Sequence, residues 1–239
     1  WVRARTGHGH EPASFTFKAG DALYRAFECR TVDTLLAFGN NGRVYSVPVA
    51  GLPGARGDGQ PVLTLIELEA GTQLLHYFAG PSQAQLLLSG SGGYGFIAQV
   101  GDMISRQRGG KAFITCNAGE TVCAPSYIGG TSGSVPVPEA THIACASAGG
   151  RLLTFPIGEL RTMPNGGRGL MLMSLEDKDV LIGAAAYTRS IRVQGTGRGG
   201  KPREETLEIR SLNNAAAARG RKGKAADWGF KPQRIRRIE

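Results

Sequence analysis

Arginines and lysines set among glycines recur in short loops along this sequence. The loops are Ala55–Gly59, Arg106–Lys111, Asn165–Gly169 and Arg219–Lys224. Glycines let the main chain approach a ligand closely, and the basic side chains displace counterions from a phosphate backbone. This combination favours binding to nucleic-acid phosphates without base readout. The candidate contacts are Arg56, Arg106, Arg108, Lys111, Arg168, Arg219, Arg221, Lys222 and Lys224, with Arg198 and Lys201 as second choices.

Other reactive side chains form no catalytic or metal-binding pattern in the sequence. The segment Gly109–Lys111 lacks the first glycine and the final Ser or Thr of a P-loop. Cys116 and Cys123 have no histidine pair nearby to complete a zinc site. His8 and His10 are better explained as turn or phosphate contacts. We therefore expect neither catalysis nor a bound cofactor in this chain.

The positive charge is concentrated toward the C-terminal end. Residues 1–188 contain 14 basic and 14 acidic residues, whereas residues 189–239 contain 14 basic and 5 acidic residues and so carry the whole net charge of +9. A basic segment favours contact with nucleic acid, and the alternative is a solvated, partly disordered tail. No apolar run approaches the roughly 18 residues of a membrane span, so we expect no membrane contact. Four scattered cysteines fit reduced thiols in the cytoplasm.

A repeat of about fifty residues must position these loops. The turn glycines Gly42, Gly93 and Gly150 each separate two apolar strands and are 51 and 57 residues apart. A second marker, Ala-Gly followed by a polar residue, stands at positions 19–21, 70–72 and 118–120, with a degraded copy at Leu175–Asp177. Gly197–Gly200 is a further glycine turn. The repeat predicts an all-β, propeller-like fold of about five four-stranded blades.

The ends of the repeat and its weaker segments lead to further predictions. Trp1–Arg3 stands where Arg43–Tyr45 stands in the next unit, so we expect a single domain, residues 1–239, cut from a longer protein, and an open or imperfectly closed ring. Apolar composition predicts strands that include Val62–Leu68 and Ala112–Cys116. The alanine-rich segment Leu212–Arg219 is the one helix-like stretch. The glycine- and proline-rich segment Gly129–Pro138 is predicted to be a flexible surface loop.

Several of these strings resemble a known family over essentially the whole chain. Gly42–Tyr45 with the following Leu52–Gly59, Gly93–Phe96 and Arg108–Ala112 resemble the C-terminal domain of the A-type subunit (ParC) of bacterial DNA topoisomerase IV, in its Gram-negative form, which is related to the C-terminal domain of gyrase A. The resemblance implies a β-pinwheel, a ring of four-stranded blades that exchange strands. It also implies that duplex DNA is bound and bent around a basic outer rim. Catalytic tyrosine, ATP and Mg²⁺ would belong to other domains of the enzyme.

One departure from the gyrase pattern concerns the box Q-R-R-G-G-K-G, which gyrase carries in its first blade. Its nearest counterpart here, Arg106–Ala112, lies in an inner repeat, and His8–Pro12 occupies the corresponding place in the first repeat. The resemblance is therefore to a domain that bends DNA rather than to one that wraps it fully.

Two classes of function follow from the sequence. The first is a non-catalytic DNA-bending module of a bacterial type II topoisomerase, in the cytoplasm and associated with the nucleoid. Its partners would be double-stranded DNA, the other domains of the A-type subunit, and the B-type subunit of the enzyme. The second is a repeat scaffold that binds protein through its loops or its basic segment. A gyrase-like wrapping domain is a variant of the first class.

Overall fold

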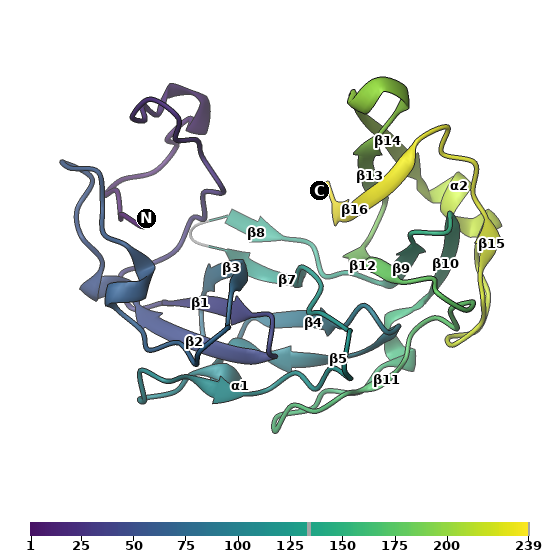
Figure 1. The fold of residues 1–239 in the computed structure, drawn as a ribbon, viewed down its shortest axis with the longest axis horizontal. Helices are drawn as coiled ribbons and strands as arrows, with labels where there is room; N and C mark the ends of the chain where they lie inside the picture. Colours follow the sequence, from purple (N-terminus) through teal and green to yellow (C-terminus); the bar gives the residue numbers. More distant parts are fainter. Residues whose placement is uncertain (133–134, 239) are drawn as a thin grey trace.

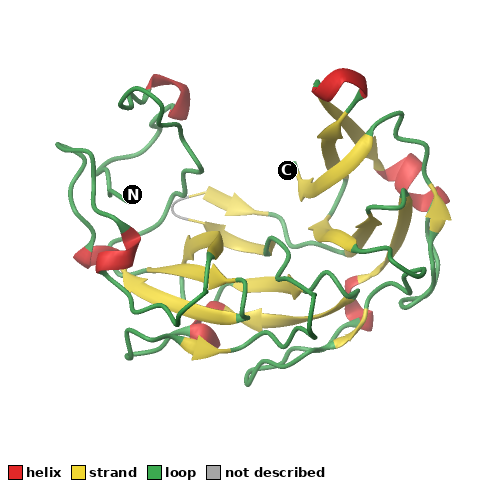
Figure 2. Ribbon diagram, viewed as in Figure 1, coloured by secondary structure: helices red, strands yellow, loops and turns green. Residues whose placement is uncertain are grey.

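The computed structural model describes residues 1–132 and 135–238, and nearly all of its regular structure is β-sheet (Figures 1 and 2). The strands are β1 (Thr34–Gly39), β2 (Arg43–Pro48), β3 (Leu74–Gly80), β4 (Gln85–Ser89), β5 (Tyr94–Gln99), β6 (Lys111–Ala112), β7 (Ser126–Ser132), β8 (Val135–Val137), β9 (His142–Ser147), β10 (Arg151–Pro156), β11 (Leu170–Met171), β12 (Leu181–Tyr187), β13 (Ser190–Thr196), β14 (Pro202–Glu208), β15 (Lys224–Ala225) and β16 (Lys231–Arg237). The described residues also form two short helices, α1 (Val100–Met103) and α2 (Ile209–Asn214), and five 3-10 turns; the turns are Pro12–Ser14, Val49–Gly51, Val62–Thr64, Ile157–Glu159 and Arg198–Gly200.

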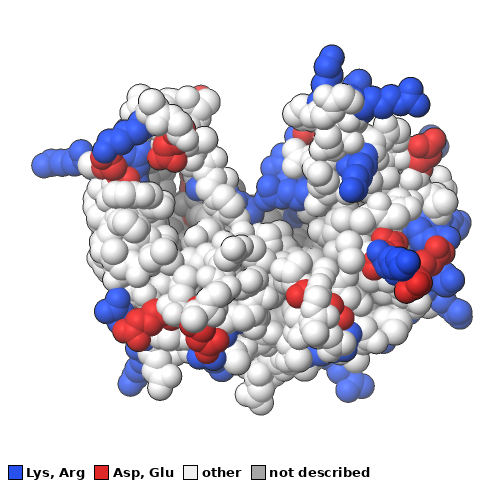
Figure 3. Space-filling model, in the orientation of Figure 1, with Lys and Arg blue, Asp and Glu red and all other residues white. Residues whose placement is uncertain are grey.

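The strands form four antiparallel sheets, the blades of a β-pinwheel. Their strand orders are β3-β1-β2-β6, β8-β7-β4-β5-β11, β12-β9-β10-β15 and β16-β13-β14. The all-β pinwheel is confirmed, but the expected number of about five blades is one too high. The blades follow one another along an arc, and its first and last units stand apart at the top of Figure 1. The space-filling view shows a notch between these two units (Figure 3).

The outermost strand of each complete blade comes from the following unit of the chain. Arg43 and Val44 pair with Ala112 and Lys111 of β6, which the chain reaches only after the next blade's hairpin. β11 pairs with β5 in the same way, and β15 pairs with β10. This exchange ties neighbouring blades together by backbone hydrogen bonds, so each unit depends on its neighbour for a complete sheet.

The unit at the N-terminal end explains why one expected blade is missing. Val2 pairs with Gln60 through two backbone hydrogen bonds. This pair is equivalent to the pair of Val44 and Lys111 in the next unit. Trp1 therefore stands at the position of Arg43. Residues 15–33 run without strand structure, so this unit adds no sheet to the four.

The second repeat marker is a four-residue turn, and the structure corrects its position in the fourth copy. Backbone hydrogen bonds close the turn at Lys18–Asp21, Glu69–Thr72, Asn117–Glu120 and Glu176–Asp179. The third residue of each turn has a positive φ: 85° at Gly20, 78° at Gly71, 81° at Gly119 and 64° at Lys178. The fourth copy is thus Glu176–Asp179, with a lysine where the others have glycine, rather than Leu175–Asp177.

Lys178 is the one non-glycine residue with positive φ in the described part of the chain, and it offers a simple stabilising substitution. A side chain in this left-handed region costs about 1–2 kcal/mol, while glycine loses about 0.5–1 kcal/mol more entropy on folding. Lys178→Gly is therefore expected to raise the free energy of unfolding by about 0.5–1 kcal/mol. Denaturant unfolding of this variant beside Lys178→Ala tests this: the alanine variant should gain nothing, and equal effects would contradict the role of φ.

Four local expectations differ from the structure. The predicted strand Val62–Leu68 begins with a 3-10 turn, and of Ala112–Cys116 only Ala112 is in a strand, because exchanged strands pair over only two residues. The helix is Ile209–Asn214, earlier than expected; Ala216 instead pairs in parallel with Thr154, since the chain there crosses back to the preceding blade. Much of the predicted loop Gly129–Pro138 forms β7 and β8; residues 133 and 134 lie outside the described residues.

The core lies between the sheets. Fully buried side chains such as Phe38, Phe96 and Phe155 come from the central strands of successive blades, which are apolar on both faces. Aliphatic side chains of the same sheets are also buried, among them Leu35, Leu36, Leu86, Leu87, Ile143 and Leu152. Among the described residues, no helix has the length and apolar character of a membrane span. The cysteines are free thiols, and burial raises the pKa of Cys123 to about 12.

Candidate nucleic-acid interface

The four basic glycine loops occupy equivalent places on the convex side of the arc (Figure 1). Each loop leads into the short exchanged segment that pairs with the outer edge of the preceding unit. In chain order these segments are Gln60, β6, β11 and β15. Each also contains a glycine of positive φ packed on a backbone carbonyl of that unit. These glycines are Gly59, Gly110, Gly169 and Gly223, whose carbonyl partners are Val2, Val44, Gly95 and Leu152. Only glycine fits here, because a Cβ would overlap or crowd the carbonyl oxygen.

An arginine fixes the loop in two of the blades. Arg43 follows the turn glycine, and its Nε and Nη2 donate to the carbonyl oxygens of Gly109 and Gly110 at 3.0 and 3.2 Å. The same guanidinium pairs with Glu69 at 3.1 Å. Arg151 repeats the arrangement: it donates to the carbonyl of Gly223 at 3.3 Å and pairs with Glu176 at 2.6 Å. In both blades, one arginine thus joins the hairpin that carries it, the second-marker turn that carries the glutamate, and the basic loop.

The middle blade makes the same connection with a different arginine. Tyr94 stands where Arg43 and Arg151 stand, and the guanidinium comes instead from the loop residue Arg168. Arg168 lies over the Tyr94 ring at 4.1 Å and pairs with Glu120 at 2.9 Å. Its side chain is one-third exposed and engaged on both sides. Arg168 thus has a structural role that its position in a basic loop did not reveal.

Three more of the predicted contact residues bind the protein itself. Arg108 donates to the carbonyl of Thr64 at 2.8 Å and stands 3.8 Å from Glu67, while its side chain is still half exposed. Lys111 donates to the carbonyl of Asp102 at 2.8 Å and lies over the ring of Phe113. Arg219 donates to the carbonyl of Met171 at 2.6 Å. These cations add positive potential to the rim but have less freedom to follow a ligand.

The remaining candidates are exposed cations. Lys222 stands 4.0 Å from Glu176, a weak ion pair at an exposed site. The other six have no side-chain hydrogen bond or ion pair within the described residues; they are Arg56, Arg106, Arg198, Lys201, Arg221 and Lys224, and we call them the free rim cations. Arg198 and Lys201 lie in the β13–β14 turn instead of an exchanged loop. Figure 3 shows basic side chains spaced along the convex side, some beside acidic ones.

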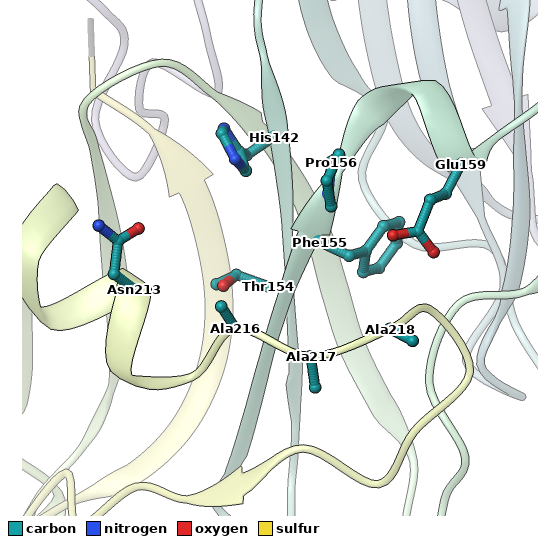
Figure 4. A pocket seen from close by; sticks show the side chains of 9 residues that line it. All are labelled: His142, Thr154, Phe155, Pro156, Glu159, Asn213, Ala216, Ala217 and Ala218. Carbon is teal, nitrogen blue, oxygen red and sulfur yellow. The ribbon is translucent and has the colours of Figure 1, made fainter.

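A hollow of about 460 Å³ lies between β10 and the Ala216–Ala218 segment, and alanine, proline and phenylalanine form much of its lining (Figure 4). His142 and Glu159 line it from different elements, the Thr154 hydroxyl beside them donates to the carbonyl of Leu212 at 3.0 Å, and Glu159 is the one carboxylate of the lining. In the described part of the chain, no group of three His, Cys, Asp or Glu residues could hold a metal ion.

Sequence reasoning overlooked two sets of residues. The first set is Arg43 and Arg151, which hold the basic loops in place. Both follow the turn glycine of their repeat, and this recurrence in the sequence could have indicated their shared role. A second set lies at the notch. It consists of Arg25, near β3, and of Arg234 and Arg236 on β16. Burial lowers the pKa of Arg25 most, and the positive charges of Arg234 and Arg236 lower it further. No pattern in the sequence brings together residues 25 and 234.

Comparison with known proteins shows which families share this sequence and architecture. A family model described as "DNA gyrase C-terminal domain, beta-propeller" matches residues 33–68 and 141–187. The A-type subunit of DNA topoisomerase 4 from Neisseria gonorrhoeae is 37% identical over 228 residues, which cover 94% of this chain and 28% of that protein. The corresponding protein from Haemophilus influenzae is 29% identical over 96% of this chain and 30% of its own length. The chain thus spans less than one third of these relatives.

Solved structures agree with the sequence relatives. The C-terminal domain of ParC from E. coli superposes with a TM-score of 0.80 at 25% identity, covering 98% of this chain and 93% of that one. The C-terminal domain of DNA gyrase A has the same fold, with a TM-score of 0.63 at 19% identity over 96% of this chain and 72% of its own.

Proposed function

Because the chain belongs to the family of C-terminal domains of the A-type subunit of bacterial DNA topoisomerase IV, which are related to those of gyrase A, we propose that it binds duplex DNA along its convex rim and bends it. The domain itself performs no catalysis. It acts within a longer protein in the bacterial cytoplasm, at the nucleoid, where cleavage, ATP hydrolysis and Mg²⁺ binding belong to other domains and to the B-type subunit. Its task is to present a DNA segment for strand passage.

The observation that carries the proposal is the fixed position of the glycine loops at the outer edge of successive units. Strand exchange brings each loop to an equivalent place, and the positive-φ glycines hold its main chain against the preceding unit. Contacts repeated along a curved edge suit a polymer with a repeating charge, which is what a phosphate backbone provides. A duplex that follows such an edge must bend, and several contacts together offset the ~1–6 kcal/mol of bending a short site.

The uneven distribution of the free rim cations favours bending over full wrapping. The loop Arg219–Lys224 supplies Arg221 and Lys224, and the loops Ala55–Gly59 and Arg106–Lys111 supply one free cation each, Arg56 and Arg106. The loop Asn165–Gly169 contributes none, because Arg168 is engaged with Tyr94 and Glu120. A duplex would be held firmly toward the C-terminal end and more loosely across the middle blade. In addition, His8–Pro12, at the place of the gyrase box, leads only into a 3-10 turn.

A protein-binding scaffold is the second candidate function. It would use the same loops or the C-terminal blade to contact another domain of the topoisomerase. The exposed side chains on the loops are charged rather than apolar, which favours DNA over an apolar protein interface.

A salt titration with a short duplex separates the two functions. Each phosphate contact contributes about 0.9 to the slope of log affinity against log salt concentration, so six free rim cations allow a slope of up to about 5. We expect a slope of several units and little dependence on base sequence. Affinity that hardly changes with salt, or that depends strongly on sequence, would contradict binding through the rim cations.

A further inference from the structure

The two ends of the arc carry arginines at equivalent positions. Turn glycines of positive φ precede β3 in the second unit, β16 in the last unit and the corresponding segment, which is not a strand, in the first unit; they are Gly71, Gly229 and Gly20. Five residues after each stands Arg25, His76 or Arg234. The inner strands border the centre of the arc, and the chain segments that carry this position in the first and last units stand on opposite sides of its opening (Figure 1).

The packing of both segments leaves these arginines outside the apolar core. On β16, Ile235 is buried opposite Val193, so its neighbours Arg234 and Arg236 lie on the other face of the strand and are exposed. At the other end, Tyr24 packs edge-on against Tyr77 and donates to the carbonyl of Leu75 at 3.1 Å. The guanidinium of Arg25 lies over the Phe27 ring at 5.1 Å. Figure 3 shows basic side chains along the side of the notch that belongs to the last blade.

The cations at the notch act on one another. Burial lowers the pKa of Arg25 most, and Arg234 and Arg236 lower it further. Burial also lowers the pKa of His76, and Arg234 and Arg25 add to that effect. Arg25 and His76 at one end of the arc are therefore subject to the positive charge of β16 at the other end.

We propose that Arg25, Arg234 and Arg236 form a phosphate-binding site at the opening of the arc, separate from the loops of the convex rim. Gathered like charges are unfavourable until an anion neutralises them, and arginine binds phosphate oxygens through paired N–H groups. A phosphate between the two ends draws them together and narrows the opening. Its source is a free phosphate compound or the phosphodiester of a nucleic-acid strand.

Pyrophosphate binding to the whole chain at low salt tests the site. Calorimetric titration compares the wild type with Arg25→Gln/Arg234→Gln/Arg236→Gln, while Arg210→Gln on α2 is a control that removes a single charge outside the notch. We expect at least tenfold weaker binding in the triple variant, unchanged binding in the control, and smaller dimensions of the wild type by X-ray scattering when pyrophosphate is bound. Equal affinity of wild type and triple variant, or no binding by the wild type, would overturn the proposal.

Thermal unfolding supplies a readout that does not depend on the ligand. Relief of like-charge repulsion should raise the melting temperature of Arg234→Gln at low salt, and added salt should remove the gain; a lower melting temperature would count against the site.

Should the triple variant fail to fold, the calorimetric comparison passes to Arg234→Gln and the charge-preserving Arg25→Lys. The variant Arg106→Gln/Arg221→Gln/Lys224→Gln, altered at the rim, should still bind pyrophosphate, so failure of this site and failure of rim binding are distinguishable. Displacement of pyrophosphate by a DNA strand would assign the phosphodiester as the source, and no displacement would assign a free phosphate compound.

Discussion

Gly42→Ala is expected to lower the free energy of unfolding by about 2–5 kcal/mol, whereas Gly71→Ala lowers it by only about 1–2 kcal/mol. Both glycines have φ of 78°, so the cost of placing a side chain in the left-handed region is the same for both. They differ in their surroundings. A Cβ at Gly42 would overlap the carbonyl oxygen of Ile114, whereas a Cβ at Gly71 meets no atom within 4 Å.

The reason for the larger effect is strand exchange. The segment that crowds Gly42 follows β6, and its amide groups at Phe113 and Ile114 donate to the Gly42 carbonyl at 3.1 and 2.9 Å. A side chain at Gly42 therefore pushes apart the junction between two blades, which other packing cannot easily restore. Gly150 provides a graded control, because it has φ of 80° but its Cβ would lie 3.4 Å from the carbonyl oxygen of Ala226.

Equilibrium unfolding in denaturant, followed by tryptophan fluorescence and circular dichroism together, measures all three variants. The expected order of destabilisation is Gly42→Ala first, with Gly150→Ala and Gly71→Ala close together. Equal destabilisation of the three would mean that φ alone governs these turns and that the exchanged segment gives way freely.

The repeat made much of this fold predictable from sequence. Gly42, Gly93 and Gly150 do occupy equivalent turns, because each must adopt positive φ in a hairpin of the same length. The basic loops share one place because the spacing from turn to loop is nearly constant. The number of sheets was less accessible: the first unit has its markers and its exchanged segment, but residues 15–33 form no strand.

The individual roles of the cations were not predictable from their loops. Arg168 and Arg106 both stand in glycine loops, yet Arg168 stacks on Tyr94 and pairs with Glu120, and Arg106 is exposed. The difference arises from residue 94, where tyrosine replaces the arginine of the other blades and leaves Glu120 for the loop to neutralise. Such exchanges depend on three segments brought together by the fold, and no single stretch of sequence contains them.

Removing three free rim cations is expected to weaken DNA binding strongly. Arg106→Gln/Arg221→Gln/Lys224→Gln deletes charges from two separate loops without breaking an intramolecular contact in the described structure. Three lost phosphate contacts should flatten the slope of log affinity against log salt by up to about 2.7. The loss should be the same for all base sequences, because phosphates carry no sequence information. Arg210→Gln, a charge removed from α2 outside the loops, should leave affinity nearly unchanged.

The most direct test of the rim path is the end-to-end distance of bound DNA. A duplex of about 40 base pairs, far shorter than its persistence length of about 150, carries a dye at each end and is nearly straight when free. Energy transfer between the dyes should rise when the wild-type chain binds, and it should rise much less with Arg106→Gln/Arg221→Gln/Lys224→Gln at saturating protein. Saturated binding by the wild type with no change in energy transfer would contradict a duplex that follows the convex rim.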